Sequence, residues 1–367
     1  MFTNQNKISN KSFFMNLALR QADINIGNTS TNPSVGCVIT KNNRILSAGF
    51  TSTNGRPHAE TNAINFSKEN LKDANLYVTL EPCSHYGKTP PCVRKIIKKG
   101  IKKVFFSIKD PDIRSFDKSS NLLISKGINV HIGESSTKIR DFYRSYLLYK
   151  NNKIPFVSCK LAISKDFFTI NKKKKWITNE YSRGRVHLMR SKHDCIITSS
   201  QTVLKDNPSL NCRIKGLEAN SPARLILDNK LKTSVKSKIY KNANKYKTIV
   251  FYNKVNRKKI KNFKKINVKT VQIPLDSDNN LDLRKILLMT KILGFSRIFI
   301  ESGPTLTINF MKSNLINDLI IFKSNHNLYK NGSGNIKIYL KDFIKNKKTI
   351  YEKVNLMDDK LDFYKIK

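Results

Sequence analysis

Four side chains within a short part of the chain have the types and order that metal-assisted hydrolysis requires. His58 and Glu60 are followed by Cys83 and Cys92. One imidazole and two thiolates can hold zinc through three ligands, which leaves the fourth position open for water, as in catalytic rather than structural zinc sites. Zinc lowers the pKa of bound water to about 7. Glu60 is not needed as a ligand, so it is free to move protons.

The surrounding residues place these side chains at the ends of secondary-structure elements. His58 begins a helix expected over 58–67, and Cys83 follows a strand expected over 74–80. Cys92 follows two prolines and should begin the next helix, where the partial positive charge of a helix N-terminus favours a thiolate. The alternative is a histidine at a helix start and two ordinary buried thiols.

The rest of the first part of the chain alternates between apolar helical and strand patterns. The expected elements are a helix at 13–26, strands on both sides of a turn at Asn42 and Asn43, a strand at 102–108, a helix at 121–127 and a strand at 128–133. This alternation predicts an α/β layered sheet. A charged helix near 135–149 leads to a predicted linker at 151–153, so we expect domains at 1–150 and 151–367.

The order of these residues matches a known sequence motif, with one difference in spacing. H-x-E followed by P-C-x-x-C is the pattern of zinc deaminases, but here eight residues, SHYGKTPP, separate Cys83 from Cys92. The segment EPCSHYGKTPPC strongly resembles the deaminase domain of the bifunctional riboflavin-biosynthesis deaminase/reductase family. The resemblance extends to NPSVGCV at 32–38 and to Asp110-Pro111.

This resemblance implies a three-layer α/β/α zinc deaminase domain with one zinc per chain. Its zinc ligands would be His58, Cys83 and Cys92, and Glu60 would carry protons from the water to the ring and the leaving ammonia. The implied substrate is a diaminopyrimidinone that carries a ribosylamino 5′-phosphate.

The resemblance also suggests substrate contacts, among them Asn32 and Lys88, although Lys88 could equally be a solvated loop lysine. His85 fits a supporting residue better than a fourth ligand, which would block the water. Two features depart from the family: Thr51 stands where a histidine is common, and the glycines common after Asp110-Pro111 are absent.

The second half has the pattern of another α/β unit. Its strand candidates are 154–163, 194–199, 223–228, 247–252, 268–273, 297–302 and 318–323. It resembles the reductase half of the same family, which has a dihydrofolate-reductase-like fold and uses NADPH. The segments that carry the resemblance are Lys160-Leu161, Ser164 and Asp166, WIT at 176–178, TSSQTVLKDNPSLNCR at 198–213 and ESGPTL at 301–306.

By this resemblance, two sets of residues form the reductase site. Those facing NADPH would be Ala162, Trp176, Thr202, Asp206, Gly303, Pro304 and Thr305. Those facing the substrate would be Arg190, Leu210, Arg213 and Glu301. Hydride would reach the ring-opened ribosyl carbon and leave a ribityl chain. Trp176 could instead be a core aromatic, and Asp206, before Asn207-Pro208, could instead make a turn.

The second half also departs from its family. Phe167 and Phe168 replace the usual G-[RK] pair, Lys174 replaces a small polar residue, and the loop at 324–334 reads SNHNLYKNGSG. These changes keep a second hypothesis open, in which the chain is a deaminase with a degenerate reductase half.

The composition bounds the remaining hypotheses. The net charge is +43 in 367 residues, and lysine is spread over the whole chain. No basic stretch is interleaved with aromatics for base stacking, so composition bias explains the charge better than a specific nucleic-acid partner. A nucleic-acid-editing deaminase is the third hypothesis. The absence of a long apolar run or signal-peptide core predicts a cytoplasmic protein without a membrane partner. Oligomeric state, including a homo-oligomer, stays open.

Overall fold

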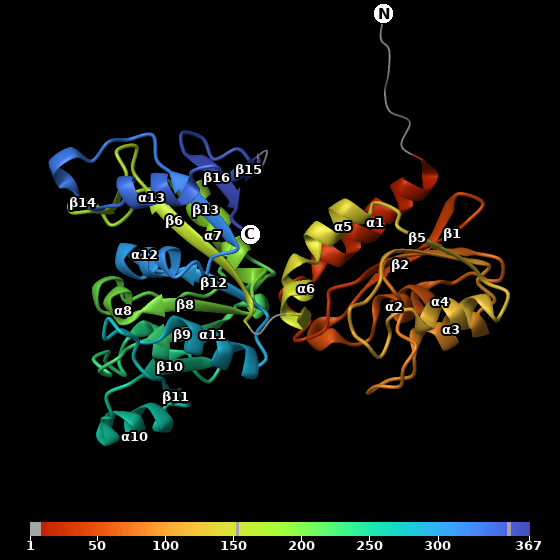
Figure 1. The fold of residues 1–367 in the computed structure, drawn as a ribbon, viewed down its shortest axis with the longest axis horizontal. Helices are drawn as coiled ribbons and strands as arrows, with labels where there is room; N and C mark the ends of the chain where they lie inside the picture. The colour runs from red at the N-terminus through yellow and green to blue at the C-terminus, as the bar shows by residue number, and fades with distance from the viewer. Residues whose placement is uncertain (1–8, 152–153, 351–353) are drawn as a thin grey trace, which may run out of the picture. The chain divides into compact units, whose positions relative to one another are not determined.

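The computed structural model describes residues 9–151, 154–350 and 354–367, and the chain divides into two compact units, residues 1–152 and 153–367. Figure 1 shows the two units, each built of helices around a sheet. The linker predicted at 151–153 lies outside the described residues beyond Asn151. No helix in the described part of the chain is long and apolar enough to cross a membrane.

The first unit is a five-stranded sheet with the strand order β2-β1-β3-β4-β5. Its strands are β1 (Gly36–Lys41), β2 (Arg44–Phe50), β3 (Asn75–Leu80), β4 (Lys103–Ile108) and β5 (Asn129–Ile132). The hairpin of β1 and β2 turns at Asn42 and Asn43, which both have positive φ, as the sequence predicts. Strands β3, β4 and β5 run parallel to one another.

Helices cover both faces of this sheet, as the three-layer prediction requires (Figure 1). They are α1 (Asn10–Ile24), α2 (Ala59–Phe66), α3 (Cys92–Lys98), α4 (Lys118–Ile124), α5 (Ser136–Phe142) and α6 (Arg144–Asn151). Two glycines allow the helices to lie close to the strands. A Cβ on Gly49 of β2 would lie 2.5 Å from the backbone nitrogen of Ala63 in α2, and a Cβ on Gly36 would lie 1.9 Å from the carbonyl oxygen of Ala18 in α1.

The prediction of one helix near 135–149 is wrong, because α5 and α6 are separate helices that meet at Tyr143. Tyr143 is buried, and its hydroxyl donates to the carbonyl of Ser34 at 3.0 Å and lies 2.6 Å from the hydroxyl of Thr79. A buried tyrosine hydroxyl needs such partners.

The second unit contains, within the described residues, a nine-stranded sheet with the order β11-β10-β9-β8-β12-β6-β13-β16-β15. Its strands are β6 (Phe156–Ile163), β8 (Cys195–Ser199), β9 (Ala223–Leu227), β10 (Thr248–Tyr252), β11 (Lys269–Gln272), β12 (Arg297–Glu301), β13 (Asp318–Lys323), β15 (Lys348–Ile350) and β16 (Lys360–Lys365). Strands β15 and β16 are antiparallel additions at one edge. A separate ribbon pairs β7 (Phe168–Asn171) with β14 (Gly332–Asn335).

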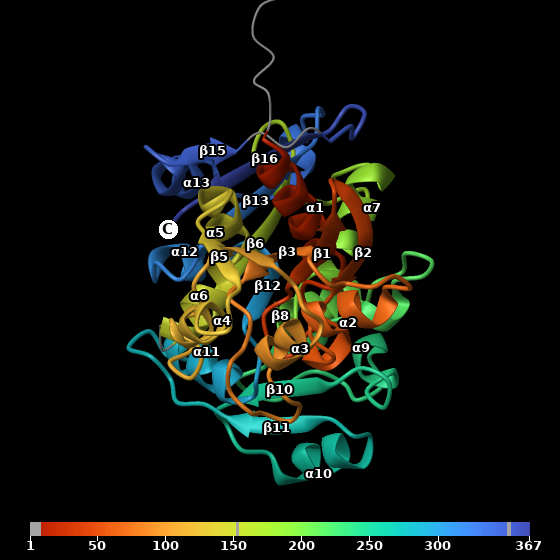
Figure 2. The same cartoon turned by 90° about the vertical axis from the view of Figure 1, so that its right-hand side faces the viewer.

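Helices pack on this sheet between the strands. They are α7 (Glu180–Ser191), α8 (Ser200–Asp206), α9 (Lys238–Lys241), α10 (Arg257–Lys265), α11 (Leu283–Ile292), α12 (Pro304–Lys312) and α13 (Lys337–Ile344), with 3-10 turns at Glu218–Asn220 and Tyr329–Asn331. Another 3-10 turn, Thr53–Gly55, belongs to the first unit. Figure 2 shows the same elements from a second direction. Apolar clusters lie on both faces of the sheet, so the second unit has its own core.

Candidate active sites

Three candidate zinc ligands from separate segments converge in the first unit. His58 is the N-cap of α2, Cys92 is the first residue of α3, and Cys83 follows β3. The Nδ1 atom of His58 lies 3.5 Å from the sulfur of Cys83 and 3.4 Å from the sulfur of Cys92. The three ligand atoms all lie within 4.8 Å of one another.

This arrangement fits zinc. A tetrahedral zinc with ordinary bond lengths places an imidazole nitrogen and a thiolate sulfur about 3.6 Å apart, close to the two distances between His58 and the cysteines. The backbone N–H of Cys92 also donates to the sulfur of Cys83 at 3.3 Å, which stabilises a thiolate. The Cys92 side chain, followed by His58, lowers the pKa of Cys83 to about 4. The same pairing with Cys83, together with burial, raises the pKa of Cys92.

Glu60 lies in the first turn of α2, one residue after Ala59, and is 3% exposed. Burial raises the pKa of its carboxyl from 4.5 to about 7, although the nearby His58 acts to lower it. A carboxyl with a pKa near neutrality can both accept and donate a proton at working pH. The structure therefore places a buried carboxyl with a pKa near neutrality beside three convergent side chains that could hold a metal ion.

His58, Glu60 and Cys83 line one cavity that is open to solvent. Asn32 also lines the cavity and donates from its side chain to the carbonyl of Gly55 at 3.1 Å. Thr51, which stands where the family commonly has histidine, lines it as well, and its hydroxyl accepts the N–H of Val35 at 3.0 Å.

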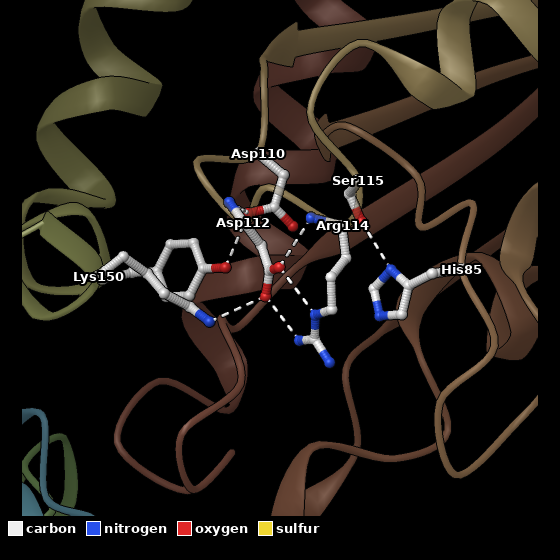
Figure 3. Close-up of polar contacts among 7 residues, drawn as sticks. His85, Asp110, Asp112, Arg114, Ser115 and Lys150 are labelled. Carbon is white, nitrogen blue, oxygen red and sulfur yellow. Dashed lines mark hydrogen bonds and ion pairs between the residues drawn. The ribbon is translucent and has the colours of Figure 1, made fainter.

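The segment between Cys83 and Cys92 contributes unequally to this cavity. His85 lines the cavity, and its Nδ1 atom lies 3.0 Å from the hydroxyl oxygen of Ser115 (Figure 3). This contact fits a supporting role for His85 better than a role as metal ligand. Lys88 is exposed and is not among the lining residues. A contact between Lys88 and substrate stays a prediction.

The structure adds to this cavity a polar group that the sequence interpretation did not assign. Asp110 is buried, and its carboxylate accepts the hydroxyl of Tyr146 at 2.8 Å and the N–H of Asp112 at 3.0 Å. Arg114 and Lys150 both contact Asp112 (Figure 3). The available signal was the aspartate pair that follows β4, since parallel strands end at a shared edge where sites form.

In the second unit, the candidate residues lie where the order of the parallel strands reverses. Strand β12 pairs in parallel with β6 on one side and with β8 on the other. From β8 the sheet continues away from β12 through β9, β10 and β11, in chain order. Ligands of open α/β sheets bind at the carboxyl ends of the strands at such a switch point. Glu301 ends β12, and Ala162 is near the end of β6.

A charged cluster stands at this point. Arg190 of α7 donates to both carboxylate oxygens of Glu301, from Nε at 2.9 Å and from Nη2 at 2.7 Å. Burial acts to raise the pKa of Glu301, but Arg190 overrides this and lowers it to about 2. Lys160 of β6 is the register partner of Glu301, and burial lowers the pKa of its ammonium group. These residues would give a sugar both anionic and cationic contacts.

Three of the cofactor candidates lie after β12, at the N-terminus of α12. Gly303 is the N-cap of α12, and Pro304 is its first residue, followed by the exposed Thr305. A helix N-terminus offers backbone N–H groups to phosphate. A Cβ placed on Gly303 would have no heavy atom within 4 Å. The glycine thus faces open space, as a position approached by a cofactor should.

Four other candidates lie on or near α8. Thr202 lies in its first turn with its hydroxyl 3.1 Å from that of Ser199, and Asp206 is its last residue. Leu210 is buried with a φ of 49°, and Arg213 is exposed. Asn207 after Asp206 is left-handed, so a turn-forming role for Asp206 stays open.

Trp176 is 54% exposed, which excludes the alternative that it is a core aromatic. The guanidinium of Arg183 and the ammonium of Lys175 lie 5.1 and 5.2 Å from the centre of its rings. An exposed aromatic flanked by cations is consistent with a ligand contact.

The structure shows where the residues that differ from the family pattern lie. Phe167 has a φ of 70°, a conformation that glycine adopts more readily, and its ring packs on the core of the second unit. Phe168 covers Gly332 in the β7–β14 ribbon, where a Cβ would lie 2.3 Å from its ring. Lys174 is exposed. The two phenylalanines are therefore held by packing within this ribbon and the core.

Comparisons with known proteins find a matching family for each half of the chain. A family model of the cytidine and deoxycytidylate deaminase zinc-binding region matches residues 8–108, and a model of the RibD C-terminal domain matches residues 155–324. The riboflavin biosynthesis protein RibD of Aquifex aeolicus is 34% identical over 84% of this chain and 85% of that protein. The chain belongs to the RibD family. The RibD protein of Buchnera aphidicola is 36% identical over 84% of this chain and 86% of its own length.

Solved RibD structures have the same architecture. RibD of Acinetobacter baumannii in form 2 is 26% identical, with a TM-score of 0.83 over 98% of this chain and 99% of that chain. A diaminohydroxyphosphoribosylaminopyrimidine deaminase/5-amino-6-(5-phosphoribosylamino)uracil reductase from Thermotoga maritima is 29% identical, with a TM-score of 0.83 over 97% of this chain and 98% of that chain. The predicted α/β fold, with a deaminase unit and a RibD reductase unit, is confirmed.

Proposed function

We propose that this chain is a bifunctional enzyme of riboflavin biosynthesis. Its first unit deaminates a diaminopyrimidinone that carries a ribosylamino 5′-phosphate, and its second unit reduces the ribosyl chain of the product to ribityl with NADPH. The observation that carries this proposal is the convergence of His58, Cys83 and Cys92 beside the buried Glu60 in a chain of the RibD family.

In the deaminase unit, His58, Cys83 and Cys92 hold the metal. Zinc at this position supplies the Lewis acidity that makes water a nucleophile at neutral pH. Glu60 accepts the proton that the water loses and delivers it to the departing amine, so that the ring carbon exchanges an amino group for an oxygen and ammonia leaves. Burial gives Glu60 a pKa near 7, which suits both transfers.

In the reductase unit, Arg190 fixes the carboxylate of Glu301, and Lys160 lies on the adjacent strand. These side chains orient the ribosyl chain, and Arg213 binds its phosphate. Gly303 leaves room for the phosphates of the cofactor at the start of α12. NADPH, when bound, supplies the hydride for the reduction.

The test is to incubate the purified full chain with the diaminopyrimidine nucleotide, with and without NADPH, and to identify the products by mass. We expect the deaminated product without NADPH and its ribityl derivative with NADPH. A deaminated product that is never reduced would favour the deaminase with a degenerate second half. An unchanged substrate would reject the proposal.

A further inference from the structure

Beside the candidate zinc site, one carboxylate is held by two cations from different parts of the chain. Arg114 donates to Asp112 from Nε at 2.8 Å and from Nη2 at 2.6 Å, and the ammonium group of Lys150 donates to Oδ2 of Asp112 at 3.0 Å. Asp112 and Arg114 lie in the loop after β4, and Lys150 lies near the end of α6. Figure 3 shows both cations directed at the same carboxylate.

This cluster lies on the same cavity as the candidate catalytic group. Asp112, Arg114 and Lys150 line the cavity that His58 and Glu60 also line. The side chain of Asp112 is 11% exposed, whereas that of Arg114 is 61% exposed. The carboxylate therefore lies inside the cluster, and the guanidinium presents its outer edge to solvent at the cavity.

The cluster carries excess positive charge. Two cations face one carboxylate, and the hydrogen bonds from Arg114, followed by those from Lys150, hold the pKa of Asp112 well below its usual range. An arginine has five N–H donors and a lysine has three. The contacts to Asp112 engage Nε and Nη2 of Arg114, so the Nη1 group can point toward a ligand.

Two neighbouring acidic groups, Asp110 and Glu81, also line the cavity, and burial raises the pKa of the Glu81 carboxyl, which disfavours its charged form. Asp110 accepts the hydroxyl of Tyr146 and the backbone N–H of Asp112, and burial raises the pKa of Asp110, which disfavours its charged form. Arg56, whose guanidinium donates to the hydroxyl of Thr89, adds a further cation to the cavity lining. The cavity lining therefore combines the buried carboxyl of Glu60 with the cations Arg56, Arg114 and Lys150.

We propose that Arg114 and Lys150, held in place by Asp112, form the subsite that binds the 5′-phosphate of the deaminase substrate. They make the deaminase unit select phosphorylated over unphosphorylated pyrimidines. This inference rests on the proposed deaminase function and assigns part of its specificity. Asp112 acts as a positioning residue, because it orients both long side chains before the phosphate arrives and so reduces the entropy lost on binding.

A purely structural role for the same contacts makes a different prediction. If Asp112 only tied the loop to α6, loss of a cation would change the deamination of phosphorylated and unphosphorylated substrates equally. A phosphate subsite instead affects the KM of the phosphorylated substrate alone. The ratio of the two KM values therefore separates the two roles.

The experiment compares the zinc-loaded full chain with Arg114→Ala and Lys150→Ala. Each protein is assayed for ammonia release from the diaminopyrimidine nucleotide and from the same compound after its phosphate is removed. For the nucleotide, a lost charge-assisted hydrogen bond should raise KM by about tenfold or more in either variant. For the unphosphorylated compound, KM and kcat should stay close to wild type. The nucleotide's KM should also rise with salt in wild type, and less steeply in the variants.

Lys109→Ala is the matched control. Lys109 also belongs to the segment after β4 and forms an ion pair with Asp117 at 2.6 Å, but it does not line the cavity. Its loss should leave both KM values unchanged. Arg114→Lys, which keeps the charge but not the two-pronged contact, should fall between wild type and Arg114→Ala.

The outcomes are separable. A tenfold loss confined to the phosphorylated substrate supports the subsite. Equal effects on both substrates, or none on either, overturn it while leaving the deaminase function intact. Failure of the wild-type protein to deaminate either compound rejects the proposed function, and the subsite is rejected with it.

Discussion

Replacement of Glu60 by glutamine tests both the burial of this carboxyl and its role. In the metal-free protein, burial raises the pKa of Glu60 from 4.5 to about 7. Folding therefore favours the protonated carboxyl, and the stability it gives is fully present below pH 4.5 and is lost as pH rises to about 7. Glutamine is neutral throughout and has no such loss.

The size of the effect follows from the difference between the two pKa values. Each tenfold change in proton affinity is worth about 1.4 kcal/mol, so ionisation of Glu60 costs the fold about 3 kcal/mol above neutral pH. In metal-free protein, Glu60→Gln should therefore gain stability over wild type as pH rises. A gain of this size corresponds to roughly 6–12 °C in the melting temperature of a domain of this length.

The assay is thermal or urea unfolding of chelator-treated protein across this pH range. Glu69→Gln is the control, because Glu69 is an exposed glutamate of the same unit that pairs with Arg44, and its loss should change stability little. Adding zinc should shrink the difference at Glu60, since a nearby dication stabilises the charged carboxylate. If wild type and Glu60→Gln respond to pH in parallel without metal, our account of the site's electrostatics is refuted.

Three further changes test other parts of the account. Cys83→Ala should lose the bound zinc in metal analysis, because two ligands rarely hold zinc against a chelator; full zinc in this variant would exclude the site. Gly303→Val should weaken NADPH binding in a fluorescence titration, whereas Arg213→Ala should weaken the deaminated substrate by at least about tenfold and the cofactor much less. If Gly303→Val instead weakened the substrate and Arg213→Ala weakened NADPH, the roles assigned to these two residues would be exchanged. Arg190 favours the charged carboxylate of Glu301, so this group stabilises wild type above pH 4.5, and the stability is lost as pH falls toward 2. Glu301→Gln should abolish this contribution. Unfolding curves of the variant that match wild type at neutral pH would argue against the ion pair.

The local motifs of the deaminase unit could be predicted from sequence because each depends on a few adjacent residues. Strand β3 is an apolar run, and prolines precede Cys92 at the start of α3, so the order of His58, Glu60 and the two cysteines already predicts which side chains approach. The sequence could not show that burial would bring the pKa of Glu60 to about 7, because that depends on everything packed around it.

The phosphate subsite could not be predicted in this way. Asp112 and Lys150 are 38 residues apart in the chain, one in the loop after β4 and one near the end of α6, and only the folded chain brings them together. The interruption between α5 and α6 is the single residue Tyr143, which apolar periodicity does not reveal, so the sequence predicts one helix there. Strands β15 and β16 were also missed, since LDFYK and KTI are short and mixed in polarity and become strands only by pairing with each other and with β13.

The most direct test of the central claim, two chemistries at two separate sites, is NADPH oxidation by the Glu60→Gln variant. Given the diamino substrate, this variant should oxidise NADPH slower than wild type by about 10²–10⁴-fold, because deamination must come first. Given the deaminated intermediate, it should oxidise NADPH at the wild-type rate. Equal loss with both substrates, or no loss with either, would contradict the account.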